Sequence, residues 1–127
     1  MNIREYSANS LSFLGDAVYT LAVREHFLNM GHQVAKDLQR CCNRYNSASG
    51  QKAVFDYLSS KNFFSSEELD VFKRGRNHIT HVPKNGDLAT YGVASGLEAI
   101  VGFLYLTDKE RLSCFFDEIL RGSFSFE

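Results

Sequence analysis

Glu98 is the only charged residue between Leu88 and Thr107, in a stretch made mostly of apolar and small residues. The stretch is about as long as a membrane-spanning helix. A carboxylate at the centre of a membrane span is costly, however, and the Gly, Ser and Thr residues around Glu98 also argue against one. We therefore expect a buried helix of a soluble protein, and no contact with a membrane.

Asp16 stands in a similar setting, because it is the only charged residue in the apolar stretch 6–23. A carboxylate placed alone in an apolar helix is costly to desolvate unless something compensates it. Two such acids, Asp16 and Glu98, suggest one shared site. A glycine inside a helix costs ~1 kcal/mol relative to alanine. Gly15 and Gly96 are therefore expected where two helices approach closely.

Carboxylates bind hard cations such as Mg²⁺, and such a cation can activate water and stabilise charge on a phosphoryl group that is being transferred. Asp16 and Glu98 are a thin ligand set, so waters or substrate would have to complete it. The alternative is that each carboxylate caps a backbone group or pairs with an arginine. The residues by themselves leave both interpretations open.

The length of 127 residues fits one domain, and the 23% of charged residues is ordinary for a soluble globular protein. The net charge of −1 gives no global basic field, so a polyanionic partner must be held by a local patch or by metal ions. The chain has three cysteines, Cys41, Cys42 and Cys114. An odd number with two adjacent predicts buried thiols in a reducing cytoplasm rather than disulfides.

Helical spacing and capping residues predict an all-α chain. The first helix is expected from Ser7–Ser10 to Gly31, with Leu11, Leu14, Val18, Leu21, Glu25 and Leu28 on one face. Further helices are expected over about 34–43, from Ser47 or Ser49 through 58, from a capping box at 65–68 to near Gly75, over about 88–106, and from a capping box at 107–110 to Gly122. The longest plausible loop is 77–87. The prediction is a bundle of about six helices.

A basic cluster is expected at the end of the fourth helix and in the loop that follows it. Its members are Lys73, Arg74, Arg76, Asn77, Lys84 and Asn85. Cationic and amide side chains of this kind can meet phosphates and sugars of a nucleic acid. Cations are also common as simple caps of helix C-termini, and the pattern does not decide between the two.

Histidines and phenylalanines carry weaker signals. A zinc pair at His78 and His81 lacks nearby cysteines or acids, so we interpret both, like His26 and His32, as ordinary polar residues. Five phenylalanines are expected in the core or in a dimer contact: Phe13, Phe63, Phe64, Phe115 and Phe116. Phe13 precedes Asp16 by three positions and is placed to pack across a subunit interface.

Residues 13–18 (Phe-Leu-Gly-Asp-Ala-Val) resemble the signature of the ribonuclease III catalytic domain, and 97–106 resemble its second acidic motif. Segments 74–77 (Arg-Gly-Arg-Asn) and 83–85 (Pro-Lys-Asn) resemble motifs of one branch, the mini-ribonucleases III. The resemblance covers about 6–120 of a single domain, 1–127, with the motifs in matching order. As in that branch, we expect no double-stranded-RNA-binding domain.

The resemblance implies a homodimeric endoribonuclease that cleaves double-stranded RNA with Mg²⁺, or Mn²⁺ in its place, and that needs no small-molecule cofactor. It implies a large-subunit (23S) ribosomal RNA precursor as substrate and 5′-phosphate products. Asp16 and Glu98 would hold the metal and carry catalysis. Contacts to the RNA backbone would come from Arg74, Arg76, Asn77, Lys84 and Asn85.

The chain also departs from the family. The larger ribonucleases III have acids where this chain has Ser12 and Ser95, which we expect to hold water near the metal. His78 and Ile79 stand where the branch commonly has a small residue and a lysine, and Gly92 stands where it commonly has an arginine. These departures motivate an alternative: a non-catalytic double-stranded-RNA-binding or ribosome-assembly module of the same fold. A helical nucleotide hydrolase would need clustered acidic pairs, which the chain lacks.

Overall fold

The computed structural model describes residues 3–31, 34–79 and 86–126. Helices account for nearly all of this part, and it contains no strand. The helices are α1 (Ala8–Asn29), α2 (Ala35–Asn46), α3 (Ala48–Ser60), α4 (Ser66–Asn77), α5 (Leu88–Thr107) and α6 (Lys109–Phe116), with a 3₁₀ turn η1 (Ile3–Glu5) before α1 and a π-helical turn η2 (Asp117–Arg121) after α6. The predicted all-α bundle of about six helices is confirmed.

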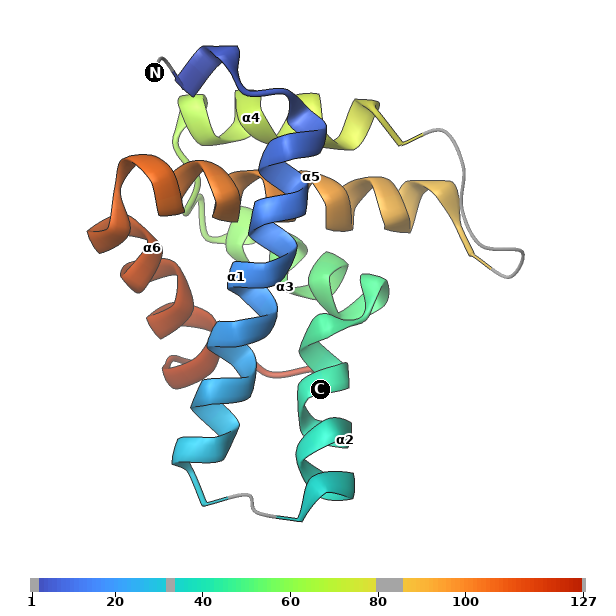
Figure 1. Cartoon of the computed structure of the whole chain (residues 1–127), viewed down its shortest axis with the longest axis vertical. Coiled ribbons are helices and arrows are strands. Elements are labelled where there is room, and N and C mark those ends of the chain that lie inside the picture. Colours follow the sequence, from blue (N-terminus) through green and yellow to red (C-terminus); the bar gives the residue numbers. More distant parts are fainter. Residues whose placement is uncertain (1–2, 32–33, 80–85, 127) are drawn as a thin grey trace.

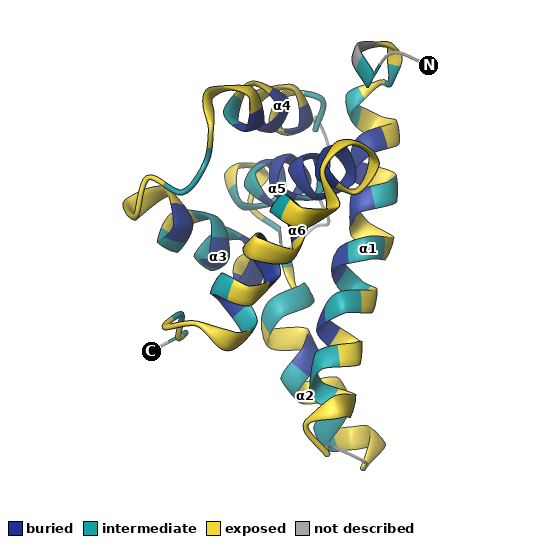
Figure 2. Cartoon of the chain, turned by 90° about the vertical axis from the view of Figure 1, so that its left-hand side faces the viewer, coloured by how far each residue is buried: buried dark blue, intermediate teal, exposed yellow. Residues whose placement is uncertain are grey.

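Helix α5 is the centre of the bundle. It packs against α1, α3, α4 and α6, and its middle is buried over more than two turns (Figures 1 and 2). By length and composition α5 could cross a membrane, but most of it is enclosed by the other helices. The apolar stretch around Glu98 is therefore the core helix of the fold.

Helices α1 and α5 cross with their backbones in contact. A Cβ atom on Gly15 would lie 1.7 Å from the carbonyl oxygen of Glu98, and one on Gly102 would lie 2.1 Å from the carbonyl oxygen of Leu11. Gly96 instead faces α4, where a Cβ would lie 2.5 Å from the ring of Phe72. The close approach predicted at Gly15 and Gly96 is confirmed, and the crossing at Gly15 is what brings Asp16 to Glu98.

Helix α4 ends at Asn77, close to Gly75 as predicted, but Gly75 itself lies inside the helix. Gly75 is buried against α5, where its Cβ would lie 2.7 Å from that of Ala99. Its small size thus serves close packing rather than termination. Arg76 and Asn77 consequently lie in the last turn of α4. Helix α2 likewise runs past the predicted end, to Asn46.

The predicted capping box at 65–68 is present, with the Ser65 hydroxyl accepting from the Glu68 N–H and the Glu68 carboxylate accepting from the Ser65 N–H. The one predicted at 107–110 is wrong. Asp108 caps α6 and accepts from the N–H of Arg111 at 3.0 Å. Thr107 belongs to α5 and donates its hydroxyl to the carbonyl of Phe103, so it is not available as a cap.

The buried face of α1 differs from the predicted stripe. Leu11, Tyr19 and Val23 are buried, whereas Leu21 and Leu28 are exposed. The buried face follows the glycine crossing, which turns Leu11 and Gly15 toward α5. Phe13 is 84% exposed.

The other phenylalanines and the cysteines complete the core. Phe115 and Phe116 are buried, and Phe63 and Phe64 pack against the core cluster, as predicted. All cysteines are free. Cys42 is buried and Cys41 half-buried, but Cys114 is exposed on α6, so the prediction of buried thiols is wrong for Cys114.

Candidate active site

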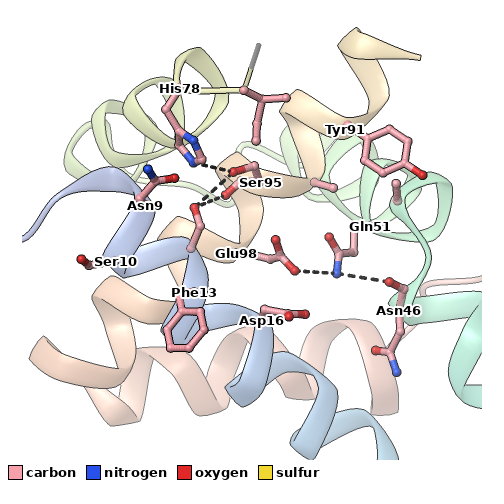
Figure 3. A pocket seen from close by; sticks show the side chains of 14 residues that line it. Asn9, Ser10, Phe13, Asp16, Asn46, Gln51, His78, Tyr91, Ser95 and Glu98 are labelled. Atoms are coloured by element: carbon pink, nitrogen blue, oxygen red, sulfur yellow. Dashed lines mark hydrogen bonds between the residues drawn. The ribbon is translucent and has the colours of Figure 1, made fainter. Parts of the chain in front are cut away.

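Asp16 and Glu98 face one another on the wall of an open pocket of about 790 Å³ (Figure 3). Asp16 comes from α1, one residue after the crossing glycine, and is exposed. Glu98 comes from the middle of α5 and is mostly enclosed. The fold therefore brings the two isolated carboxylates together, and their role as a functional site stays a prediction.

The environment of Glu98 makes its ionised form costly. Burial raises the pKa of Glu98, and the neighbouring Asp16 carboxylate raises it further, to about 8. A hydrogen bond from Gln51 acts in the opposite direction. Two neighbouring carboxylates that share a site need either a shared proton or a cation between them, because two uncompensated negative charges repel one another.

Gln51 is a site residue that the sequence analysis missed. It is 3% exposed, and its amide nitrogen donates to Glu98 Oε2 at 3.4 Å and to the carbonyl oxygen of Asn46 at 3.5 Å. Gln51 therefore ties α3 and the end of α2 to the carboxylate on α5. A signal was available: Gln51, Val54 and Leu58 follow helical spacing, so a glutamine occupies a core position of α3.

Asn46 adds a second amide to the same wall. It is the last residue of α2 and lines the pocket together with Gln51 and Glu98. Its Oδ1 is buried and accepts no hydrogen bond from the described part of the chain. An unsatisfied buried acceptor costs ~1–3 kcal/mol, so this end of the pocket has unused capacity for a donor.

A third group joins Ser12, Ser95 and His78. The Ser12 hydroxyl donates to the carbonyl oxygen of Ser95 at 2.9 Å, and the two hydroxyl oxygens are 3.2 Å apart. Ser95 Oγ is also 2.9 Å from Nε2 of His78, the residue that follows α4. Both serines line the pocket, as the sequence suggested, but they hydrogen-bond each other and a histidine rather than the acids. Whether they hold water near a metal stays a prediction.

His78 lies in the turn after α4, as expected of a polar loop residue, but the sequence does not indicate its partner. Its ring lines the pocket and hydrogen-bonds a buried serine of α5 (Figure 3). The missing signal has a physical reason. The spacing of His78 to other ligand-type residues in the sequence gives no hint of its partner, because Ser95 is on a different helix.

The basic cluster is spread over more than one surface. Arg74 donates to the carbonyl oxygen of Tyr6 at 2.9 Å and lines a separate cavity beside η1. Arg76 stacks its guanidinium over Phe72 at 5.6 Å and donates to Asn77 Oδ1 at 3.3 Å. Neither arginine lines the acidic pocket. Lys73 is exposed on α4, and Lys84, Asn85 and His81 lie outside the described residues.

The donor set of the pocket suits a hard cation. Carboxylate, amide and hydroxyl oxygens lie on its wall, and these are the ligands that Mg²⁺ and Mn²⁺ prefer. Within the part of the chain that the structure describes, no three or more His, Cys, Asp or Glu side chains lie together so that they could hold a metal ion. The protein thus offers two charged ligands, and Mg²⁺ commonly keeps several waters in such sites. The raised pKa of Glu98 agrees with this, because a cation would relieve the repulsion between the two acids.

Comparisons with known proteins place this geometry in a family. The model of the ribonuclease III domain matches residues 9–109, which include both acids. A mini-ribonuclease 3 from Symbiobacterium thermophilum is 40% identical over 119 residues, 92% of this chain and 87% of the relative. One from Brevibacillus brevis is 42% identical over 101 residues, 79% of this chain and 74% of the relative.

A solved structure agrees with the sequence comparison. The crystal structure of protein FN1578 from Fusobacterium nucleatum superposes with a TM-score of 0.82 at 28% identity, covering 94% of this chain and 97% of that one. The bundle and its crossing helices are therefore shared with a solved structure along nearly their whole length. By domain, relatives and fold, the chain belongs to the ribonuclease III family and, within it, to the mini-ribonuclease 3 branch.

Proposed function

We propose that the protein is a metal-dependent endoribonuclease that cleaves double-stranded RNA, and that it matures the precursor of large-subunit (23S) ribosomal RNA. The observation that carries the proposal is the pair Asp16 and Glu98 on an open pocket, in a chain of the mini-ribonuclease 3 branch. The pocket is a shallow opening between helices rather than an enclosed cavity. The sugar-phosphate backbone of an RNA can therefore reach the two acids without any local unfolding of the protein.

Asp16 and Glu98 would hold a Mg²⁺ or Mn²⁺ ion. When bound, such an ion supplies an activated water and stabilises negative charge on the phosphodiester under attack. Gln51 keeps the Glu98 carboxylate in place. Hydrolysis adds water across the P–O3′ bond, leaving a 5′-phosphate on one fragment and a 3′-hydroxyl on the other.

Double-stranded RNA is read largely through its shape, phosphates and 2′-hydroxyls, so a small domain without base readout is physically sufficient. Backbone contacts are assigned to Arg74, Arg76, Asn77, Lys84 and Asn85. The free cysteines support a reducing cytoplasm as the place of action.

A homodimer would place two such sites on one duplex. Phe13 supports it, because this ring lines the pocket together with Asp16 and is exposed in the single chain, as expected for a side chain that a second subunit covers. Phe13→Asp should yield monomers in light scattering at micromolar concentration, with Leu88→Asp, at another exposed apolar position, as the matched control. A wild-type protein that is monomeric in this measurement would contradict the dimer.

A second candidate is a non-catalytic double-stranded-RNA-binding module. It is favoured by Ser12 and Ser95, whose hydroxyls are hydrogen-bonded to one another where larger relatives have acids. The two candidates differ only in whether RNA is cut.

The deciding experiment incubates purified protein with long double-stranded RNA in Mg²⁺ or in chelator. Cleavage should require the metal, and Asp16→Asn and Glu98→Gln should abolish it while leaving the protein folded. Asp56→Asn is the control, because Asp56 is an exposed carboxylate on α3 that pairs with Lys52 and does not line the acidic pocket. Binding without cleavage under every condition would favour the non-catalytic module.

A further inference from the structure

His78 stands at a point where RNA entering the acidic pocket needs a compensating group. Its ring lines the same pocket as Asp16 and Glu98. Within the described part of the chain, no lysine or arginine lines this pocket, so His78 is the only lining side chain that can carry a positive charge. A phosphodiester that approaches two carboxylates meets repulsion, which a nearby N–H donor reduces.

The ring is held in place by α5. Its Nε2 is 2.9 Å from Ser95 Oγ, and Ser95 in turn contacts the buried Ser12 on α1. The Ser12 hydroxyl is already committed to the Ser95 carbonyl, so the imidazole is the outer end of a hydrogen-bonded chain that starts in the core. A ring fixed in this way loses little further freedom when it binds a ligand.

Two of the three proton arrangements of the ring leave a donor on its far edge. When Ser95 donates its hydroxyl hydrogen to Nε2, the ring hydrogen lies on Nδ1. When the imidazole is protonated, both nitrogens are donors. A neutral ring that donates Nε2–H to Ser95 Oγ instead leaves Nδ1 as an acceptor, so Nδ1–H is available to a ligand in the first two arrangements. Within the described ranges Nδ1 makes no hydrogen bond.

Helix capping alone does not explain the ring. The backbone N–H of His78 makes the cap contact, by donating to the Arg76 carbonyl. The side chain is not needed for this contact and turns to α5 instead. The next residue, Ile79, also lines the pocket and is uncharged. It stands where the branch commonly has a lysine, so the cation that such a lysine would supply is absent at this position.

We propose that His78 is a substrate-binding residue whose Nδ1–H donates to a phosphate oxygen of the RNA strand that enters the pocket between α1 and α5. The inference rests on the proposed function for its ligand, RNA, but not for catalysis. His78 binds and positions the strand and takes no part in the bond-breaking step.

The test measures binding of a fluorescent RNA duplex in chelator, where cleavage is off, at one fixed salt concentration. His78→Leu should weaken the affinity about tenfold, the usual effect of losing a charge-assisted hydrogen bond. His78→Gln, which keeps an N–H donor and a partner for Ser95, should stay close to wild type. His26→Leu is the control, because His26 lies at the other end of α1 beside a different cavity.

A His78→Leu protein with wild-type affinity and a lowered thermal midpoint would overturn the proposal and reduce His78 to a structural brace. Should this variant not fold, the imidazole signals of wild-type His78 in NMR spectra, assigned by their absence in His78→Gln, must shift when the duplex is added. Unshifted signals overturn the proposal as well.

The outcomes also separate this inference from the proposed function. If the wild type binds RNA, His78→Leu weakens binding and Mg²⁺ never elicits cleavage, the RNA contact stands and the nuclease proposal fails. If the wild type cleaves and His78→Leu binds normally, the nuclease stands and the contact fails. If the wild type does not bind the duplex at all, both fall.

Discussion

The carbonyl oxygen of Glu98 occupies the space in which a side chain on Gly15 would have to begin, 1.7 Å from the position of its Cβ. The backbone of one acidic helix therefore rests on the backbone of the other, one residue before Asp16. The contact that makes the fold compact is also the contact that makes the site. A change at Gly15 should consequently disturb both.

Gly15→Ala should destabilise the protein by more than the ~1–3 kcal/mol typical of an overpacked core, because the clash is with backbone that cannot rotate away. Helices α1 and α5 would have to separate, which moves Asp16 from Glu98. Chemical denaturation should show the loss of stability. Ala17→Ser, at an exposed position of the same helix, is the control. A Gly15→Ala protein of wild-type stability would contradict the crossing geometry.

The raised pKa of Glu98 predicts how the stability of the metal-free protein depends on pH. Between its ordinary value of 4.5 and about 8, the folded protein keeps a proton on Glu98 that the unfolded chain has released. Raising the pH through this window should therefore lower the free energy of unfolding. Urea denaturation in chelator at several pH values measures the slope.

Two variants isolate the contribution of Glu98 to that slope. Glu98→Gln removes the titrating group and should flatten it, so that this variant is more stable than wild type at pH 8 in chelator. Asp16→Asn removes a neighbouring charge and should move the upper end of the window to lower pH. Added Mg²⁺ should stabilise the wild type at high pH but not Glu98→Gln. An unchanged slope in Glu98→Gln would show that other groups cause it.

Replacing Gln51 should lower the affinity for the metal without unfolding the protein. Gln51→Met keeps the side-chain volume but removes the N–H that binds Glu98 Oε2. Loss of such a supporting hydrogen bond typically costs ~10–100-fold in metal affinity or activity. The Mn²⁺ affinity, measured by titration calorimetry, should fall accordingly. Gln39→Met, an exposed glutamine on α2, is the control, and equal Mn²⁺ affinities in the two variants would exclude a positioning role for Gln51.

The sequence predicted the parts of this protein that depend on local pattern or on an isolated charge. Asp16 and Glu98 could be paired because each is alone in an apolar helix, and Gly15 could be assigned because a helix-interior glycine needs a reason. The same logic did not predict that Gly75 packs against α5, because a glycine near a helix end and one that packs against a neighbour look alike in sequence.

The missed site residues have a common cause. Gln51 and His78 acquire their roles only from residues distant in the chain, Glu98 and Ser95. Hydrogen bonds between different helices depend on the crossing geometry, which periodicity does not contain. The face of α1 was misjudged for the same reason, since the glycine contact rather than the apolar stripe decides which side is buried.

The last prediction concerns Arg74 and Arg76, which belong to the same basic cluster in the sequence but lie in different surroundings in the structure. Both are expected to contact RNA phosphates. Arg74 also binds the Tyr6 carbonyl and so fixes the segment before α1, whereas the hydrogen bond and the ring contact of Arg76 lie within α4, on Asn77 and Phe72. Loss of a hydrogen bond between distant segments costs ~0.5–1.5 kcal/mol. Arg74→Ala should therefore lower the thermal midpoint more than Arg76→Ala does.

RNA binding is the second readout for this pair. Each lost phosphate contact reduces the number of counterions released, so either alanine variant should flatten the dependence of affinity on salt and weaken binding to all duplex sequences alike. Single-turnover cleavage at saturating RNA should change little, since neither side chain lines the acidic pocket. Asp70→Asn, on the same helix, controls for changes at the α4 surface. A lowered midpoint with an unchanged salt slope would make the arginine concerned a structural residue and remove it from the RNA interface.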